Sequence, residues 1–305
     1  MAIFQFGPII KTRREELGLT QEDLADGICS VPTLSRIENG ERMPTKNHFE
    51  MLLQRLGYSD MTLDFFTDKQ TFLLHELKIK IRYAYMAKDY PLAKKLFDEF
   101  ESLLDNPTNI DKQFAILYQT LFDQTQFNNA DRLKRFEDAL KLTCPQYIGG
   151  RIPHTLSYEE IILLNNIAIC HHIANNMEHA IDILYILTEY YEHHMISTDE
   201  SLRTQPMILY NLSKFLGLSG RYDECIKICD LGIQIARTTG RCRLLGDTLF
   251  NRAWSLIQRK HIGDMEEAEQ TLRQAIYISV AMANQKDTEF MCKYYEDIFS
   301  KRIAL

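Results

Sequence analysis

The sequence lacks the motifs that mark the common enzyme classes. No Gly-rich phosphate-binding loop, no G-x-S-x-G motif and no H-E-x-x-H motif occurs among its 305 residues. The seven cysteines are an odd number at scattered positions, which fits reduced thiols better than a framework of disulfides. We therefore expect a protein that is not an enzyme and that binds no metal and no cofactor.

Long apolar runs and strand patterns are missing as well. No stretch of eighteen apolar residues occurs, so no membrane partner is expected. The short apolar N-terminal stretch precedes its basic residues, unlike a secretion signal, which favours a cytoplasmic protein. Beyond Tyr58, proline and glycine thin out and apolar residues recur at spacings of three and four. We therefore predict an all-α fold.

What the N-terminal region does contain is a set of helix signals between residues 11 and 42. The stretch KTRREELGLTQEDLADGICSVPTLSRIENGER predicts three short helices. Their starts and ends are marked by capping and helix-ending residues: Gly18, Thr20 with Asp23, Gly27, Ser30 and Asn39-Gly40. This spacing is typical of a DNA-binding helix-turn-helix, and the alternative is a helical bundle that carries the same caps.

The residues left on the outside of the third helix suit contact with DNA. These residues are Val31, Pro32, Thr33, Ser35 and Arg36. Thr33 can reach a thymine methyl group or a base edge, and Arg36 can reach a guanine or a phosphate. The start of the second helix can hold a phosphate, together with its neighbours: Arg13, Arg14, Gln21, Arg42 and Lys46.

The same stretch resembles the Cro/CI-type helix-turn-helix family. The family's signature of T-Q-x-x-L-A followed by S-R-I-E-N-G occurs here as residues 20–25 and 35–40. The resemblance implies that Gln21, Val31, Pro32, Thr33 and Arg36 contact operator DNA. However, residues 1–66 contain seven Lys or Arg against ten Asp or Glu, and the whole chain has a net charge of −7. Since phosphate neutralisation supplies most non-specific affinity, we expect a homodimer on two half-sites.

A repeat follows in the remainder of the chain. An aromatic residue or Met is followed three residues later by a small residue at five places: Tyr90/Ala93, Phe127/Ala130, Met177/Ala180, Tyr222/Cys225 and Met265/Ala268. The intervals of 37 to 50 residues hold two helices and a loop each. The pattern resembles degenerate tetratricopeptide repeats, and this resemblance implies a right-handed helical solenoid.

The domain organisation follows from these two patterns. We predict a helix-turn-helix domain over residues 1–66, and a helical linker that starts the array over residues 67–86. Repeats that bind a peptide are predicted over 87–284, and a C-terminal capping helix over 285–305. The apolar residues of this helix are expected to point inward: Phe290, Tyr294, Ile298 and Phe299.

Asparagines recur on the first helices of successive repeats. They are Asn165, Asn166, Asn211 and Asn251, and both Asn166 and Asn211 lie fourteen residues before the small residue of their repeat. First helices line the concave face of such solenoids. A carboxamide offers an acceptor and two donors, which match the backbone of an extended peptide. The alternative is that these side chains cap or bridge neighbouring helices.

Residues one turn away from the asparagines complete the candidate peptide site. The set comprises Ile169, Met207, Lys214, Asp247 and Trp254. Trp254 is the only tryptophan and can anchor an apolar peptide residue, although an aromatic residue at this spacing can equally belong to the core. Arg203 and Arg243 can meet a peptide carboxylate, or they are ordinary solvated charges.

The combination of a helix-turn-helix, a helical repeat array and these asparagines resembles the Rgg, PlcR, NprR and PrgX group of peptide-responsive regulators. The resemblance implies a quorum-sensing transcription regulator that is switched by a short signalling peptide, with Asn165 or Asn166 and Asn211 as the best-matched contacts. Two alternatives stay open. In one, a protein partner docks on the repeats; in the other, the chain is an adaptor of the Rap type that binds no DNA.

Overall fold

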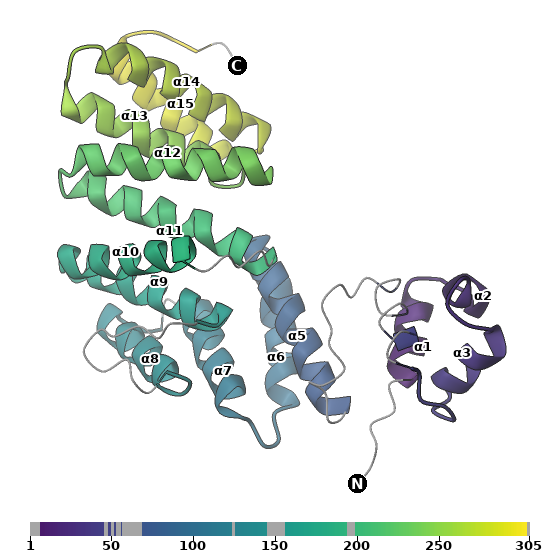
Figure 1. The fold of residues 1–305 in the computed structure, drawn as a ribbon. Coiled ribbons are helices and arrows are strands. Elements are labelled where there is room, and N and C mark those ends of the chain that lie inside the picture. Colours follow the sequence, from purple (N-terminus) through teal and green to yellow (C-terminus); the bar gives the residue numbers. More distant parts are fainter. Residues whose placement is uncertain are drawn as a thin grey trace. The chain divides into compact units, whose positions relative to one another are not determined.

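The computed structural model describes residues 7–45, 48–49, 52, 56, 69–123, 126–144, 156–193 and 199–303. Within these residues all regular structure is helical and no strand occurs, which confirms the predicted fold class. The chain divides into two compact units, residues 1–106 and 107–305, and Figure 1 shows both. The domain boundaries predicted above at residues 66, 86 and 284 stay predictions.

The N-terminal unit begins with the predicted helix-turn-helix. Its helices are α1 (Gly7–Glu16), α2 (Gln21–Ala25) and α3 (Val31–Glu38). Thr20 and Asp23 form a capping box at the start of α2, and the Ser30 hydroxyl accepts a hydrogen bond from the backbone N–H of Thr33 at the start of α3. The turns contain glycines with φ between +67° and +72°: Gly18, Gly27 and Gly40. The predicted starts and ends of these helices are therefore confirmed.

Burial of one apolar cluster holds these short helices together. The cluster takes side chains from all three helices and from the segment that follows α3: Ile10, Leu24, Ala25, Leu34, Ile37, Phe49, Leu52 and Leu56. Because helices of five to ten residues are unstable alone, this shared core fixes the orientation of α3. The N-terminal unit also contains a hairpin of α5 (Lys69–Met86) and α6 (Tyr90–Ser102).

The C-terminal unit is an array of helical hairpins. Its helices are α7 (Asn109–Phe122), α8 (Asn129–Lys141), α9 (Tyr158–Ile173), α10 (Met177–His193), α11 (Asp199–Leu218), α12 (Tyr222–Thr239), α13 (Leu245–Arg259), α14 (Asp264–Ala281) and α15 (Gln285–Phe299). Each helix packs on the next along the chain, and Figure 1 shows α9 to α15 stacked in order. The first helices of the hairpins also contact one another, α7 with α9, α9 with α11, and α11 with α13.

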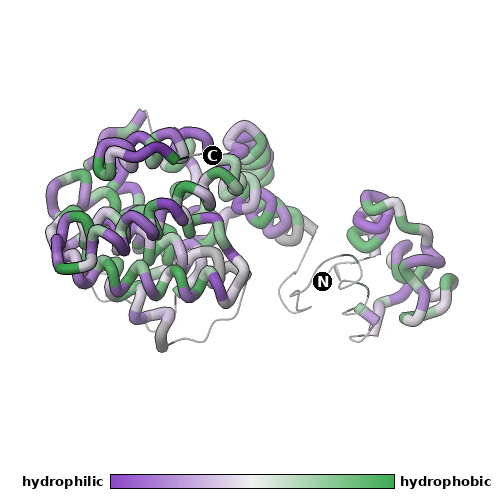
Figure 2. The backbone as a smooth tube through the Cα atoms, turned by 90° about the horizontal axis from the view of Figure 1, so that it is seen from above, coloured by the Kyte–Doolittle hydropathy of each residue, from purple (hydrophilic) through white to green (hydrophobic). Residues whose placement is uncertain are grey.

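The repeated residue pairs mark the second helix of each hairpin, as the sequence predicts. Helices α6, α10 and α12 begin at the aromatic residue or Met of the pair. Four of the small residues are fully buried, namely Ala93, Ala180, Cys225 and Ala268, whereas Ala130 is exposed. Figure 2 shows hydrophobic and hydrophilic stretches alternating along the helices, as expected where each helix buries one face.

The C-terminal helix α15 buries only part of the face predicted, since Tyr294 and Phe299 are partly buried against the core. Its buried side chains are Thr288, Met291 and Tyr295. Phe290 is 57% exposed and Ile298 is 36% exposed, so the prediction that these two point inward is wrong. The reason is that Met291 and Tyr295 form the stripe that packs in the cluster with Ala275 and Ile276. Phe290 and Tyr294 instead contact Phe250 of α13, with ring centroids 5.5 and 5.4 Å away.

None of the described helices has both the length and the apolarity that crossing a bilayer would need.

Candidate functional sites

The first candidate site is the exposed side of α3. Pro32 and Arg36 are exposed, and Thr33 and Ser35 are partly exposed. The Thr33 hydroxyl shares a hydrogen bond of 2.9 Å with Ser30, which fixes its side chain at the first turn of the helix. Val31 packs partly against the apolar core, so it also supports the position of α3. These residues share one helix, with Pro32 and Thr33 in its first turn and Arg36 in its last.

The basic residues near α2 divide into internal and exposed ones. Arg14 is buried and donates hydrogen bonds to the Glu38 carboxylate at 2.7 and 3.0 Å and to the carbonyl of Leu19 at 2.9 Å. Arg14 therefore ties α1 to α3 and is not a phosphate contact, contrary to the expectation above. The Gln21 amide donates to the same carboxylate at 2.8 Å, which holds the N-terminus of α2 against α3.

The other cations of the predicted DNA surface remain at the surface. Arg42 is exposed, and its backbone N–H donates to the carbonyl of Arg36 at 3.1 Å, which places the two residues side by side. Arg13 is partly exposed and pairs with Glu16 at 2.8 Å. Lys46 lies outside the described residues. The sequence therefore predicted the exposed arginines, while the internal role of Arg14 was hidden because its partner Glu38 lies 24 residues away.

The second candidate site is the asparagine series of the C-terminal unit. The Asn211 amide on α11 donates to the carboxamide oxygen of Asn165 on α9 at 2.8 Å. The Asn251 amide on α13 donates to the Ser213 hydroxyl of α11 at 3.0 Å and to the backbone carbonyl of Tyr210 at 3.4 Å. Each of these amides thus bridges its helix to the preceding first helix.

This bridging leaves part of the series available to a ligand. Asn165 has a partner at both ends of its carboxamide, because its oxygen accepts from Asn211 and its amide donates to the Met207 sulfur at 3.9 Å. Within the described residues, the carboxamide oxygens of Asn211 and Asn251 accept no recorded hydrogen bond. Asn166 is half-buried and donates to the carbonyl of Ile162 on its own helix at 2.8 Å. The bridging interpretation therefore accounts for the amides of Asn211 and Asn251, whereas peptide binding by their oxygens stays a prediction.

A groove of about 410 Å³ lies next to this series. It is lined from α11, α12, α13 and α15, and it contains four of the predicted peptide contacts: Lys214, Asp247, Asn251 and Trp254. The predicted residues Asn165, Asn166, Ile169, Met207 and Asn211 lie on α9 and α11 outside this lining. The backbone of Arg203 belongs to α11, but its side chain is outside the described part of the chain.

The groove also contains aromatic residues that the sequence analysis did not assign to a site: Tyr210, Phe250, Phe290 and Tyr294. Burial raises the pKa of Tyr210 to about 12, and the nearby carboxylates of Asp247 and Asp287 add to this shift. A signal for these residues did exist, because Phe290 and Tyr294 lie one turn apart on α15. The sequence pattern instead predicts that this stripe is the buried face of the capping helix.

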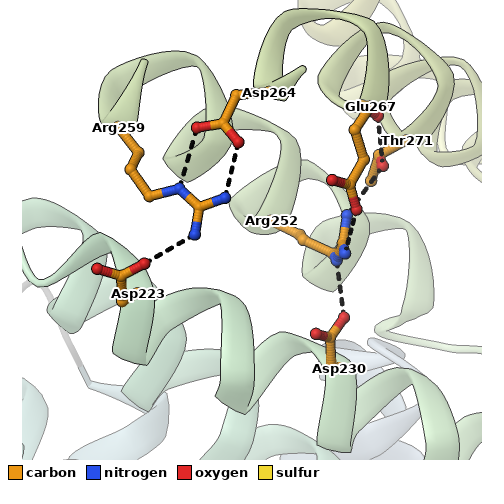
Figure 3. A network of polar contacts seen from close by, with 7 residues as sticks. All are labelled: Asp223, Asp230, Arg252, Arg259, Asp264, Glu267 and Thr271. Atoms are coloured by element: carbon orange, nitrogen blue, oxygen red, sulfur yellow. Dashed lines mark hydrogen bonds and ion pairs between the residues drawn. The ribbon is translucent and has the colours of Figure 1, made fainter. Parts of the chain in front are cut away.

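Two arginine networks connect α13 to its neighbouring helices, as Figure 3 shows. Arg252 pairs with Asp230 of α12 at 2.7 Å and with Glu267 of α14 at 2.6 Å. Arg259 pairs with Asp223 of α12 and Asp264 of α14, each at 2.7 Å. The Arg259 guanidinium is the main cause that lowers the pKa of Asp264 to about 2. These ion pairs join α13 to α12 and α14.

A helix-turn-helix combined with a helical repeat array and a lined groove defines the class of transcription regulators with a sensory repeat domain. Sequence comparison agrees with this class. Residues 10–61 match the helix-turn-helix family, and residues 94–297 match the RNPP family C-terminal domain. The chain therefore belongs to the RNPP family. Among curated protein sequences, none matches the chain.

Solved structures with a similar fold cover nearly the whole chain. Bacillus thuringiensis PlcR in complex with the peptide PapR7 and DNA has a TM-score of 0.65 and 17% identity, and the match covers 94% of this chain and 98% of that one. The Streptococcus dysgalactiae SHP pheromone receptor Rgg2 has a TM-score of 0.53 and 16% identity, with 95% and 98% covered. ComR from S. thermophilus, in complex with DNA and its signalling peptide ComS, has a TM-score of 0.52 and 13% identity, with 93% and 96% covered.

Proposed function

We propose that this protein is a cytoplasmic quorum-sensing transcription regulator that is not an enzyme. It binds operator DNA as a homodimer through α3, and a short signalling peptide that binds along the first helices of the repeats shifts its affinity for DNA. The observation that carries the proposal is that one chain combines an exposed recognition surface on α3 with a groove beside unused asparagine oxygens on α11 and α13.

The DNA-binding part of the proposal rests on the surface of α3 and its neighbours. The N-terminal turn of a recognition helix enters the major groove in this class of domain. Thr33 and Arg36 lie on the exposed side of α3, and Arg42 lies beside Arg36. We assign base contacts to Thr33 and Arg36 and phosphate contacts to Arg13, Gln21 and Arg42. The presence of this surface disfavours an adaptor that binds no DNA.

The peptide-binding part rests on the polar atoms of the first helices. A buried backbone N–H of a peptide needs an acceptor, and the oxygens of Asn211 and Asn251 are acceptors held in fixed positions by the amides of the same side chains. PlcR and ComR were each solved with a peptide and DNA. The similar fold of this chain supports the same pairing of ligands here.

The dimer is expected to form through the C-terminal helices. Exposed large apolar side chains lie on α14 and in the turn before α15: Met265, Tyr277, Val280 and Met282. A stable interface usually buries more than ~1,000 Å², and side chains of this kind can supply its apolar part. In sedimentation of the full chain at micromolar concentration, we expect a dimer for the wild type and a shift toward monomer for Tyr277→Glu.

The proposal is tested by selecting binding sites from a pool of random duplex DNA with the full-length protein. An inverted repeat with half-sites about one helical turn apart, or a near multiple, is expected. A positional-scanning library of synthetic heptapeptides is then passed over the same protein. Retained peptides are expected to change the affinity for the selected DNA. Absence of any enriched DNA sequence, or retained peptides without effect on DNA binding, contradicts the proposal.

A further inference from the structure

Gly217 of α11 lies directly against the side chain of Trp254 on α13. A Cβ atom added to this glycine would lie 3.2 Å from Cζ3 and 3.5 Å from Cε3 of the indole. It would also lie 3.4 Å from the Oγ of Ser255. Carbon atoms in ordinary contact are about 3.5–4.0 Å apart. Any side chain in place of this glycine therefore pushes on the indole ring.

The backbone of α11 does not itself require a glycine at this position. The left-handed turn after the helix is made by Gly220, with a φ of +80°, whereas Gly217 belongs to the last turn of α11 and has no positive φ. Glycine also stabilises a helix less than alanine does. The glycine is therefore explained by the space that the indole of Trp254 takes against α11.

The groove is the open space beside this indole. The ring of Tyr222, the first residue of α12, occupies another side of the indole, with ring centroids 6.0 Å apart and planes at 70°. Gly217 and Trp254 both line the groove, as does Leu218. An indole that is pushed away from α11 therefore moves into the groove and reduces its volume.

Aromatic rings form the wall of the groove on α13 and α15. The ring of Phe250 lies 5.5 Å from that of Phe290 and 5.4 Å from that of Tyr294, measured between centroids. Phe290 is nevertheless 57% exposed. Aromatic rings attract one another in offset or edge-to-face arrangements at centroid separations of about 4.5–7 Å. An aromatic ring from a ligand can join this cluster and cover Phe290.

The size of the groove fits one part of a peptide rather than all of it. Its volume of about 410 Å³ lies near the lower end of the ~300–1,000 Å³ that is typical of small-ligand pockets. Asn251, the proposed acceptor for the peptide backbone, lines the same groove one residue after Phe250. A peptide held at Asn251 therefore places a neighbouring side chain among the aromatic rings. A small side chain there would leave Phe290 uncovered.

Resting on the proposed function, we propose that Gly217 is a positioning residue that decides which side chain of the signalling peptide the groove accepts. Because Gly217 leaves room for the indole of Trp254 against α11, the groove stays open for an aromatic side chain. This side chain packs between Trp254 and Phe290, while the oxygen of Asn251 accepts a hydrogen bond from the peptide backbone. With a larger residue in place of Gly217, the groove admits only small side chains.

A positional-scanning library of synthetic heptapeptides without tryptophan, passed over the full-length protein and read by mass spectrometry, tests this role. For the wild type, peptides with Phe or Tyr at one position are expected to be enriched by about fivefold over their Ala counterparts. Gly217→Val should remove this enrichment and favour Ala or Ser at that position. Gly217→Val combined with Trp254→Phe should restore it, because a phenyl ring lacks the outer indole carbon that lies next to Gly217.

Gly232 of α12 provides the matched control. A Cβ added to this glycine would lie 3.3 Å from Cγ2 of Thr248, so the crowding is similar, but Gly232 lies outside the lining of the groove. Gly232→Val should therefore leave the aromatic preference unchanged. Circular dichroism of each variant checks that the helices persist. If Gly217→Val loses helix, Gly217→Ala decides the test with Gly232→Ala as its control, since the added Cβ alone should weaken the preference.

The fluorescence of Trp254, the only tryptophan of the chain, reports on the indole directly. A retained heptapeptide that contains Phe should shift its emission to shorter wavelength, because the peptide ring covers the indole. Unchanged emission would overturn the inference and leave the proposed function intact. The same holds if retained peptides show no aromatic preference, if Gly217→Val keeps that preference, or if Gly232→Val loses it equally. Retention of no peptide would overturn both.

Discussion

The two candidate sites differ in how far apart along the chain their cooperating residues lie. In the helix-turn-helix, Thr20 caps with Asp23 and Ser30 with Thr33, each pair three residues apart. In the groove, Lys214, Asp247 and Asp287 come from three helices and are more than thirty residues apart from one another. The candidate base contacts are thus positioned by capping at the start of α3, whereas the lining of the groove comes together only after the repeats have stacked.

The two sites should therefore respond differently to mutation. A DNA contact on α3 is exposed and can be changed without loss of the fold. In Asn211 and Asn251 the amide nitrogen joins two helices, and the oxygen is the proposed peptide acceptor. A substitution of either residue should therefore alter both stability and peptide binding. The exception in the N-terminal unit is the buried pair of Arg14 and Glu38, which is long-range like the contacts of the array.

We expect the largest loss of stability from removing the buried ion pair between Arg14 and Glu38. In Arg14→Ala the Glu38 carboxylate, whose side chain is fully buried, loses its cation and keeps the neutral amide of Gln21 on α2 as a hydrogen-bond donor. Removing one partner of a buried ion pair typically costs about 3–5 kcal/mol. Hydrogen exchange measured by mass spectrometry should show loss of protection in α1, α2 and α3, with the array unchanged.

Two further variants sharpen this test. Arg36→Ala should leave the protection of α1 to α3 at the wild-type level, because Arg36 is exposed. Replacing both partners, as in Arg14→Met with Glu38→Leu, should recover much of the lost protection, since apolar pairs of similar volume often substitute for buried ion pairs. Wild-type protection in Arg14→Ala would show that the pair does not hold the three helices together.

A smaller loss of stability is expected in the array when the ion pair between Arg259 of α13 and Asp264 of α14 is removed. Arg259→Ala leaves Asp264, whose side chain is 4% exposed, without its two strong hydrogen bonds to the guanidinium. The carboxylate keeps only the hydrogen bond from the backbone N–H of His261, and the loss of partners at a buried polar group costs about 1–3 kcal/mol. Urea unfolding of the full chain should show a lower midpoint for the array, with Arg302→Ala, at an exposed C-terminal site, as the control.

The same pair predicts a pH dependence. The pKa of Asp264 is lowered to about 2 in the folded state, below the ordinary 3.8 of the unfolded chain. The stabilisation is therefore fully present above pH 4 and is lost as the pH falls from about 4 toward 2. The wild type should lose stability over this range more steeply than Arg259→Ala. Equal slopes for the two proteins would contradict the assignment.

Substitution of the exposed arginines of the helix-turn-helix should change the affinity for DNA and leave the stability of the fold unchanged. Arg36→Ala should weaken binding to the selected operator by ~1–3 kcal/mol if it reads a base, and it should relax the sequence preference at one position of each half-site. Arg42→Ala should weaken all sequences alike and lower the dependence on salt. Fluorescence anisotropy at several salt concentrations measures both, and identical effects of the two variants would remove the distinction between base and phosphate contacts.

The comparison also explains what the sequence could predict. Helix boundaries in the N-terminal unit follow from caps and glycines, and the repeat pattern of Tyr222/Cys225 and its relatives located the hairpins, because both signals are local. The face of α15 could not be predicted, since Met291 and Phe290 are both apolar and only the packing partners decide which is buried. The Arg14 pair and the close approach of Gly217 to Trp254 depend on contacts between distant segments, which one sequence does not contain.

The smallest effect should come from separating the two roles of an array asparagine. Asn251→Ala removes the bridging amide and the free oxygen, and it should lower stability by about 0.5–1.5 kcal/mol and weaken binding of a retained heptapeptide. Asn251→Asp loses the same donor but keeps an acceptor, so stability should fall while most of the peptide affinity is kept.

Asn166→Ala, which loses only a bond within its own helix, is the control for stability. Calorimetry of peptide binding and urea unfolding are compared for all three. Equal peptide affinity in Asn251→Ala and the wild type would mean that this carboxamide serves only to join α13 to α11.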